Sequence, residues 1–123
     1  MSEEVLNIKL LKEEIEKFAI ERDWEKFHTP KNLAAALSVE SSELLEIFQW
    51  LSDEDCQQLL DEKDPGVISK IEEEISDILA YTIRLAGILE INVPEALERK
   101  LKKNAEKYPA NLVKGSARKY SDY

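Results

Sequence analysis

The amino-acid sequence predicts an all-α fold, and two observations carry that prediction. The 123-residue chain contains only three glycines and four prolines, the residues that most often interrupt helices. Apolar residues in its long stretches of Glu, Lys, Leu, Ile and Ala recur every three to four positions, which is the period of a helix. A helical chain of this length has a modest core. We therefore expect a helical bundle of four main helices plus one short helix, with its core completed by oligomerisation.

Start and stop signals place the first two helices. A first amphipathic helix is expected near residues 3–22, followed by an irregular connection at 23–28. Thr29 before Pro30 is an N-cap and first-turn signal, which begins a second helix of about residues 30–51.

The same signals place the remaining elements. Ser52 begins a short helix, and Asp64-Pro65-Gly66 ends it. The third main helix should cover residues 66–91, and the fourth should run from Pro94 to about Lys107. Because the apolar period fades after these helices, we expect one domain at residues 1–110 and a basic C-terminal arm at residues 111–123.

Two pairs of carboxylates lie inside the apolar helices. Glu40 and Glu43 form the first pair, and Glu74 and Asp77 form the second. A spacing of three residues puts both members of a pair on one helix face. Glu40 also stands where the apolar seam of its helix requires another apolar residue, and a lone buried carboxylate there would be costly. Packing the two helices together would bring four carboxylates around a cation.

The ligand types indicate which cation. Oxygen ligands without histidine or thiolate suit Mg2+, with Mn2+ as the second candidate, and argue against zinc, copper and iron-sulfur sites. The single histidine, His28, lies outside both acidic pairs, which disfavours a di-iron bundle with its Glu-x-x-His pairs. One such acidic pair is usually solvated helix surface. Two pairs on adjoining apolar helices favour the metal site.

The charge is unevenly distributed. A net charge of -9 disfavours binding to polymeric nucleic acid. Residues 99–119 nevertheless contain eight basic residues and one acidic residue, whereas residues 1–98 contain nine basic and 24 acidic residues. This split suits a ligand that holds a metal at one end and presents phosphate oxygens to lysines at the other. Alternatively, the basic residues complement a helix C-terminus and neutralise an acidic body.

Composition limits the other classes. The single cysteine, Cys56, excludes an internal disulfide, and without a leader or a long apolar span we expect a cytoplasmic protein with no membrane partner. No Gly-x-x-x-x-Gly-Lys loop is present to hold phosphates through backbone amides, so phosphate chemistry would depend on the metal.

Several other residues are candidates for ligand binding. Trp24 and Trp50 would suit a planar base by stacking, although each alone is more often a packing residue. His28 either hydrogen-bonds a base edge or caps local backbone. Tyr81 lies one helical turn beyond Asp77, and Arg84 continues that stripe or pairs with an acid. Three residues on one face of the fourth helix would reach sugar hydroxyls or phosphate oxygens: Lys100, Asn104 and Lys107.

Two sequence runs resemble a known family. The run ESSELLEIFQW from Glu40 to Trp50 and the run EEISDILAY from Glu73 to Tyr81 resemble the all-α MazG-like nucleoside triphosphate pyrophosphohydrolases. The flanking runs RDWEKFHTPKNL at 22–33 and NAEKYP at 104–109, with Lys119-Tyr120, resemble the dCTP pyrophosphatase branch of that family.

That resemblance implies hydrolysis of a nucleoside triphosphate to the monophosphate and pyrophosphate, by a homotetramer built as a dimer of dimers. It implies Mg2+ ligands at Glu40, Glu43, Glu74 and Asp77. It further implies a base pocket at Trp24, His28 and Trp50, with sugar or phosphate contacts from Tyr81, Lys100 and Asn104. We expect Glu40 to orient or deprotonate the attacking water.

The substrate expected from the resemblance is dCTP or a modified dCTP, in housekeeping of the nucleotide pool. The alternatives are dATP, dUTP or a damaged nucleotide. An alternative from another class is a non-catalytic helical interaction module, in which the acids form a solvated face and the basic tail binds a partner.

Overall fold

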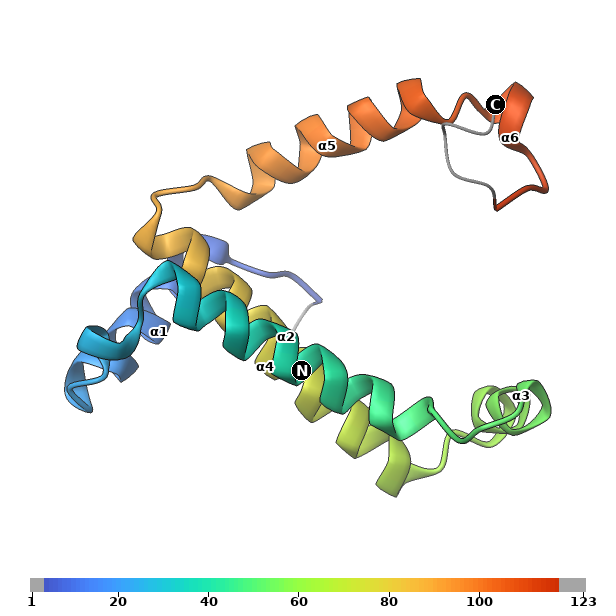
Figure 1. The fold of residues 1–123 in the computed structure, drawn as a ribbon, viewed down its shortest axis with the longest axis horizontal. Coiled ribbons are helices and arrows are strands. Elements are labelled where there is room, and N and C mark those ends of the chain that lie inside the picture. Colours follow the sequence, from blue (N-terminus) through green and yellow to red (C-terminus); the bar gives the residue numbers. More distant parts are fainter. Residues whose placement is uncertain (1–3, 118–123) are drawn as a thin grey trace. The chain divides into compact units, whose positions relative to one another are not determined.

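The computed structural model describes residues 4–117, and these residues form helices and no strand (Figure 1). The elements are, in order, α1 (Ile8–Glu21), the 3-10 helix η1 (Glu25–Phe27), α2 (Pro30–Phe48), α3 (Asp53–Glu62), α4 (Pro65–Ile88), α5 (Val93–Lys107) and α6 (Ala110–Val113). They divide into two units, one up to Glu90 and the other from Ile91 onward. The predicted all-α class is confirmed.

The capping signals explain where the helices begin. The side chain of Thr29 accepts a hydrogen bond from the Asn32 amide, as predicted for the start of α2. Ser52 and Asp55 form a capping box at the start of α3. Asp64 caps α4 by accepting from the Gly66 amide.

Two predicted boundaries were wrong. The first helix begins at Ile8 rather than near residue 3, because the side chain of Asn7 accepts a hydrogen bond from the Leu10 amide and caps it there. The short helix α6 covers the start of the segment expected as a basic arm, and its four residues are too few to show an apolar period. The end of the expected basic arm, at 118–123, lies outside the described residues.

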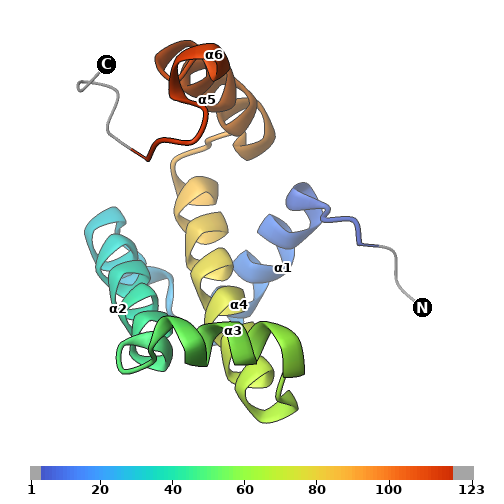
Figure 2. The same cartoon turned by 90° about the vertical axis from the view of Figure 1, so that its right-hand side faces the viewer.

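In the first unit, α4 packs against both α2 and α1 (Figures 1 and 2). Four apolar residues of these helices are buried: Ala19, Leu33, Ile83 and Ala86. Many large apolar side chains remain exposed within the chain, including Leu45 and Leu60 at 63% each. Ile75 on α4 is 45% exposed. Completion of the core by oligomerisation stays a prediction, and these exposed side chains are consistent with it.

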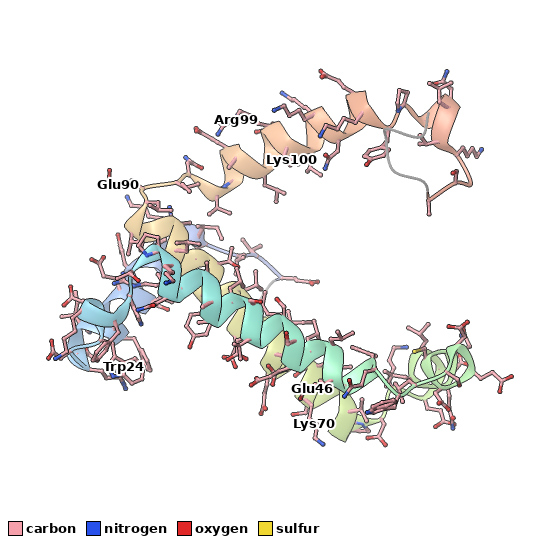
Figure 3. All side chains as sticks on the ribbon, in the orientation of Figure 1. Trp24, Glu46, Lys70, Glu90, Arg99 and Lys100 are labelled. Carbon is pink, nitrogen blue, oxygen red and sulfur yellow. The ribbon has the colours of Figure 1, made fainter. Side chains whose placement is uncertain are left out.

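The second unit consists of α5 and α6. Asn92 caps α5 by accepting a hydrogen bond from the Glu95 amide, and Pro94 lies in its first turn. Arg99 and Lys100 project from this helix (Figure 3). None of the helices in residues 4–117 combines the length and the apolar character needed to cross a membrane.

Candidate active site

Packing of α2 against α4 brings three carboxylates together. Glu40 comes from α2, and Glu74 and Asp77 come from successive turns of α4. One carboxylate oxygen from each of the three lies within 4.8 Å of the others. The sequence predicted that these two helices would converge their acids, and the structure shows this for three of the four.

Glu43, the fourth predicted ligand, is exposed and lies outside that group of three. Its negative charge is nevertheless close enough to raise the pKa of both Glu40 and Glu74. Glu43 therefore borders the acidic cluster, and its role as a ligand stays a prediction.

The cluster is electrostatically unfavourable by itself. Oε2 of Glu40 and Oε2 of Glu74 are buried and have no hydrogen-bond partner. Burial, followed by the neighbouring Glu43 and Glu74 carboxyl groups, raises the pKa of Glu40 to about 7. The nearby Glu40 carboxyl group acts to lower the pKa of Glu74, but burial and the Glu43 and Asp77 carboxyl groups outweigh it, so the pKa of Glu74 is raised. Oxygen acceptors without partners among like charges are suited to a hard divalent cation.

A cavity of about 400 Å³ adjoins this cluster within the first unit. Glu40 and Asp77 line part of it. Apolar and aromatic side chains from α1, α4 and the segment between α1 and α2 line most of the remainder: Ile15, Phe18, Trp24, Ala80 and Tyr81. Its other polar lining residues are Glu14, His28 and Arg84. A flat apolar group and an anionic group can therefore be bound in one cavity.

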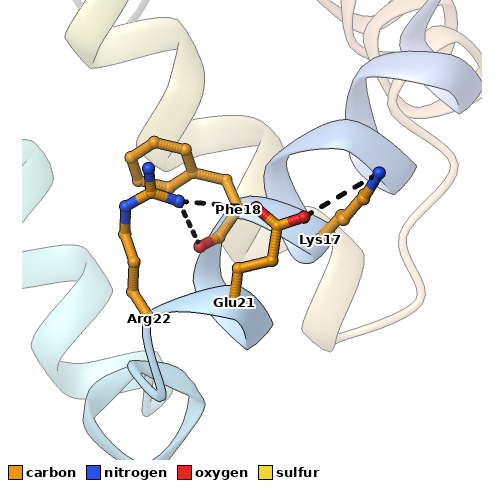
Figure 4. Close-up of polar contacts among 4 residues, drawn as sticks. All are labelled: Lys17, Phe18, Glu21 and Arg22. Carbon is orange, nitrogen blue, oxygen red and sulfur yellow. Dashed lines mark hydrogen bonds and ion pairs between the residues drawn. The ribbon is translucent and has the colours of Figure 1, made fainter.

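Phe18 and Trp24 form an aromatic wall of that cavity. Their rings meet edge to face, with centroids 5.7 Å apart and planes at 69°. The Arg22 guanidinium lies 3.6 Å from the centre of the Phe18 ring, and its Nη1 donates a hydrogen bond to the Phe18 carbonyl (Figure 4). Asp23 has a φ of 55°, which turns the chain after α1 and brings Trp24 back beside Phe18.

His28 and Arg84 form the polar part of the lining. The Nε of Arg84 donates a 3.1 Å hydrogen bond to Nδ1 of His28, which joins α4 to the segment before α2. Arg84 is only 8% exposed. Burial and the positive charge of Arg84 lower the pKa of His28, so the imidazole is neutral at neutral pH.

The remaining predicted residues are elsewhere. Trp50 is 86% exposed and does not line this cavity. Lys100, Asn104 and Lys107 belong to the second unit. The two lysines are exposed, and Asn104 is half-buried. The base-binding role of Trp50 and the sugar or phosphate contacts of these three residues stay predictions.

Sequence reasoning had assigned no binding role to Phe18 or Glu14, both on α1. Phe18 belongs to the apolar face of an amphipathic helix, and such a residue is ordinarily read as core. It had also left Arg84 as a possible partner of an acid. Among the described residues Arg84 has no ion pair with a carboxylate and bonds to His28 instead.

Known proteins resemble this chain in sequence and in fold. A family model described as the MazG-like family matches residues 35–123. The dCTP pyrophosphatase 1 of Mus musculus is 44% identical over 106 residues, which are 85% of this chain and 61% of that protein. The dCTP pyrophosphatase 1 of Homo sapiens is 41% identical over 105 residues, with the same two coverages. The chain thus spans about three fifths of the length of these mammalian relatives.

A solved structure is similar along nearly its whole length. The crystal structure of a pyrophosphatase from Archaeoglobus fulgidus superposes with a TM-score of 0.74 and is 41% identical. The match covers 89% of this chain and 98% of the archaeal one. With the family model covering well over half of its residues, the chain belongs to the MazG-like family.

Proposed function

We propose that this chain is a Mg2+-dependent pyrophosphohydrolase that converts dCTP, or a modified dCTP, to the monophosphate and pyrophosphate. One observation carries the proposal: a single cavity is lined by two carboxylates of the acidic cluster and by the aromatic wall of Phe18 and Trp24. A nucleotide has this same division between an anionic phosphate chain and a flat base. The names of the mammalian relatives and of the archaeal structure support the reaction and the substrate.

The carboxylates fit a Mg2+ site. Glu40, Glu74 and Asp77 offer oxygen ligands, and the two buried oxygens without a partner are the kind of acceptor that a hard cation requires. Glu43, at the border of the cluster, is the fourth ligand in this proposal. A bound Mg2+ would offset the charge of the phosphates and lower the pKa of a coordinated water.

The protein side chains have separate tasks. Glu40 is our candidate for orienting or deprotonating the water that attacks the α-phosphorus, because burial raises the pKa of its carboxyl group toward the working pH. Trp24 and Phe18 stack with the base and exclude water from it. Tyr81, one turn beyond Asp77 and in the same cavity, contacts the sugar. Lys100, Asn104 and Lys107 contact phosphate oxygens or sugar hydroxyls.

The proposed assembly is a homotetramer. Large apolar side chains such as Leu45 remain exposed in the single chain, and covering them is the usual function of a subunit interface. Trp50 would then complete the base pocket in the assembled protein. The chain would act on free nucleotides of the nucleotide pool.

A nucleotide panel tests the proposal. The purified chain is incubated with dCTP, 5-methyl-dCTP, dUTP, dATP and dGTP, with Mg2+ or with EDTA, and products are identified by phosphorus NMR. We expect Mg2+-dependent formation of pyrophosphate and monophosphate, fastest with dCTP or its methylated form. In 18O-labelled water the label should enter the monophosphate, because the attack is on the α-phosphorus. Release of orthophosphate, or no turnover of any nucleotide, would contradict the proposal and favour the helical interaction module.

A further inference from the structure

Arg84 is an unusual side chain for the interior of this unit. It lies on α4 two turns after Asp77, it is only 8% exposed, and none of the described carboxylates pairs with it. A buried guanidinium without a counter-charge is costly unless its donors are used. Within residues 4–117 its one side-chain hydrogen bond runs from Nε to His28, and no described residue accepts from its terminal N–H groups. Because Arg84 also lines the cavity, those donors are available to a ligand.

The bond between Arg84 and His28 also fixes the chemistry of the histidine. An arginine Nε can only donate, so Nδ1 of His28 must be the acceptor and cannot carry a proton. A neutral imidazole with an unprotonated Nδ1 carries its proton on Nε2. His28 is therefore held as a donor at Nε2, and it lines the same cavity as Arg84. The polar lining thus contains two adjacent donor groups.

We propose that Arg84 is the positioning residue that holds His28 as an Nε2–H donor, and that the two together select a base edge with two adjacent acceptors. This inference rests on the proposed function, since it concerns how the same pocket chooses its nucleotide. Cytosine presents O2 and an unprotonated N3 side by side. Uracil and thymine keep the O2 acceptor but carry a proton on N3, which would face a donor and leave that donor without an acceptor. The pair therefore favours cytosine over the other pyrimidines.

The preference for cytosine over uracil depends on Arg84. Without its Nε–H, the proton of His28 is free to move to Nδ1, and Nε2 then becomes an acceptor that can bind N3–H of uracil. Loss of Arg84 should thus relax the preference for cytosine rather than abolish binding of every base. A residue that only fills space would lower affinity for all pyrimidines alike.

The test uses the whole 123-residue chain and two readouts. Because His28 is the only histidine, its two ring nitrogens give unambiguous signals in 15N NMR spectra. The wild type should show the Nε2–H form at neutral pH, and Arg84→Met should show exchange toward the Nδ1–H form. In parallel, calorimetry measures binding of dCMP and dUMP with Mg2+ present. We expect the preference for dCMP to fall about tenfold in Arg84→Met, as for the loss of one charged hydrogen bond.

Two further variants give the test its controls. Lys70→Met removes an exposed positive charge from the same helix, far from Trp24 (Figure 3), and should change neither readout. Arg84→Lys keeps a cationic donor and should restore part of the preference, and it serves where Arg84→Met folds poorly.

The proposal is overturned by an Nδ1–H tautomer in the wild type or by an unchanged base preference in both Arg84 variants. Absence of binding to either monophosphate would also overturn it. Failure of the proposed function has a different signature: no pyrophosphate is released from any triphosphate, whatever the tautomer of His28.

Discussion

Glu40 on α2 and Glu74 on α4 each bury a carboxylate oxygen that has no hydrogen-bond partner, and an oxygen from each lies within 4.8 Å of the other. Asp77 and Glu43 add further negative charge beside them. In protein interiors, carboxylates are normally hydrogen-bonded or ion-paired, and those without a partner are normally exposed to solvent. The pair therefore weakens the metal-free fold and supplies acceptors for a cation. The same geometry that costs stability without an ion provides affinity for one.

Neutralising Glu40 should therefore stabilise the metal-free protein. We expect the midpoint of thermal unfolding of Glu40→Gln, measured in EDTA, to rise by a few degrees, since the amide keeps the shape and removes one like charge. Mg2+, which should raise the midpoint of the wild type, should have almost no effect on this variant. Glu46→Gln, an exposed change on the same helix, is the matched control. A wild type whose midpoint is the same in Mg2+ and in EDTA would contradict the metal site.

The raised pKa of Glu40 predicts a specific pH dependence. In the folded, metal-free chain Glu40 has a pKa of about 7, whereas its ordinary value is 4.5. The folded chain therefore binds a proton at Glu40 more tightly than the unfolded chain does. The contribution of Glu40 to the free energy of unfolding is highest below pH 4.5, where both states are protonated, and it falls as the pH rises to about 7. Urea unfolding in EDTA measures this change. The free energy of unfolding of the wild type should fall relative to that of Glu40→Gln over about two to three pH units, between about pH 5 and pH 8.

Mg2+ binding should have the opposite dependence. The ion binds the ionised carboxylates, so its affinity should rise as the pH increases toward 7, and binding should release protons. Calorimetry in two buffers of different ionisation enthalpy measures that release. Glu40 ionises between about pH 5.5 and pH 8, so the Mg2+ affinity should increase measurably over that range if Glu40 is a ligand. Equal affinities at the two pH values would mean that Glu40 is not a ligand.

The sequence predicted the helices well because their signals are local. Thr29 and Ser52 each cap the helix that they were expected to begin, and Asp64, expected only to end the short helix, caps α4. The convergence of Glu40 with Glu74 and Asp77 was also predictable, because a carboxylate in an apolar seam requires a partner from the facing helix. Both predictions depend on spacing along one helix, which a single sequence contains.

The contacts that the sequence could not specify are those across distant segments. The bond between His28 and Arg84 joins residues 56 positions apart, and no periodicity relates them. The position of Trp24 beside Phe18 depends on the positive φ of Asp23. Asp can adopt a positive φ, but its presence in a sequence does not predict one. Trp50, which the family resemblance placed in the base pocket, is 86% exposed within the chain.

Substitutions of Asp77 and Glu43 should both lower turnover, and the effect at Glu43 should depend on the Mg2+ concentration. Asp77 lies in the group of three carboxylates and lines the cavity, so Asp77→Asn should lower kcat for the proposed reaction by about a hundredfold or more. Glu43 borders the cluster, and Glu43→Gln should have a similar effect if it is the fourth ligand. Its effect should shrink as the Mg2+ concentration increases, because a weakened site is then refilled. Near-normal pyrophosphate release by Asp77→Asn would rule out this site.

The two tryptophans should report on different events, because Trp24 lies in the cavity wall and is 44% exposed whereas Trp50 is 86% exposed outside that wall. In Trp50→Phe the remaining indole is Trp24, and we expect its fluorescence to change on addition of dCMP with Mg2+. In Trp24→Phe the remaining indole is Trp50. If subunits cover Trp50, its emission should shift to shorter wavelength as the protein concentration increases, in step with the mass measured by light scattering. Emission typical of water-exposed indole at every concentration would show that no interface covers Trp50 and would remove it from the base pocket.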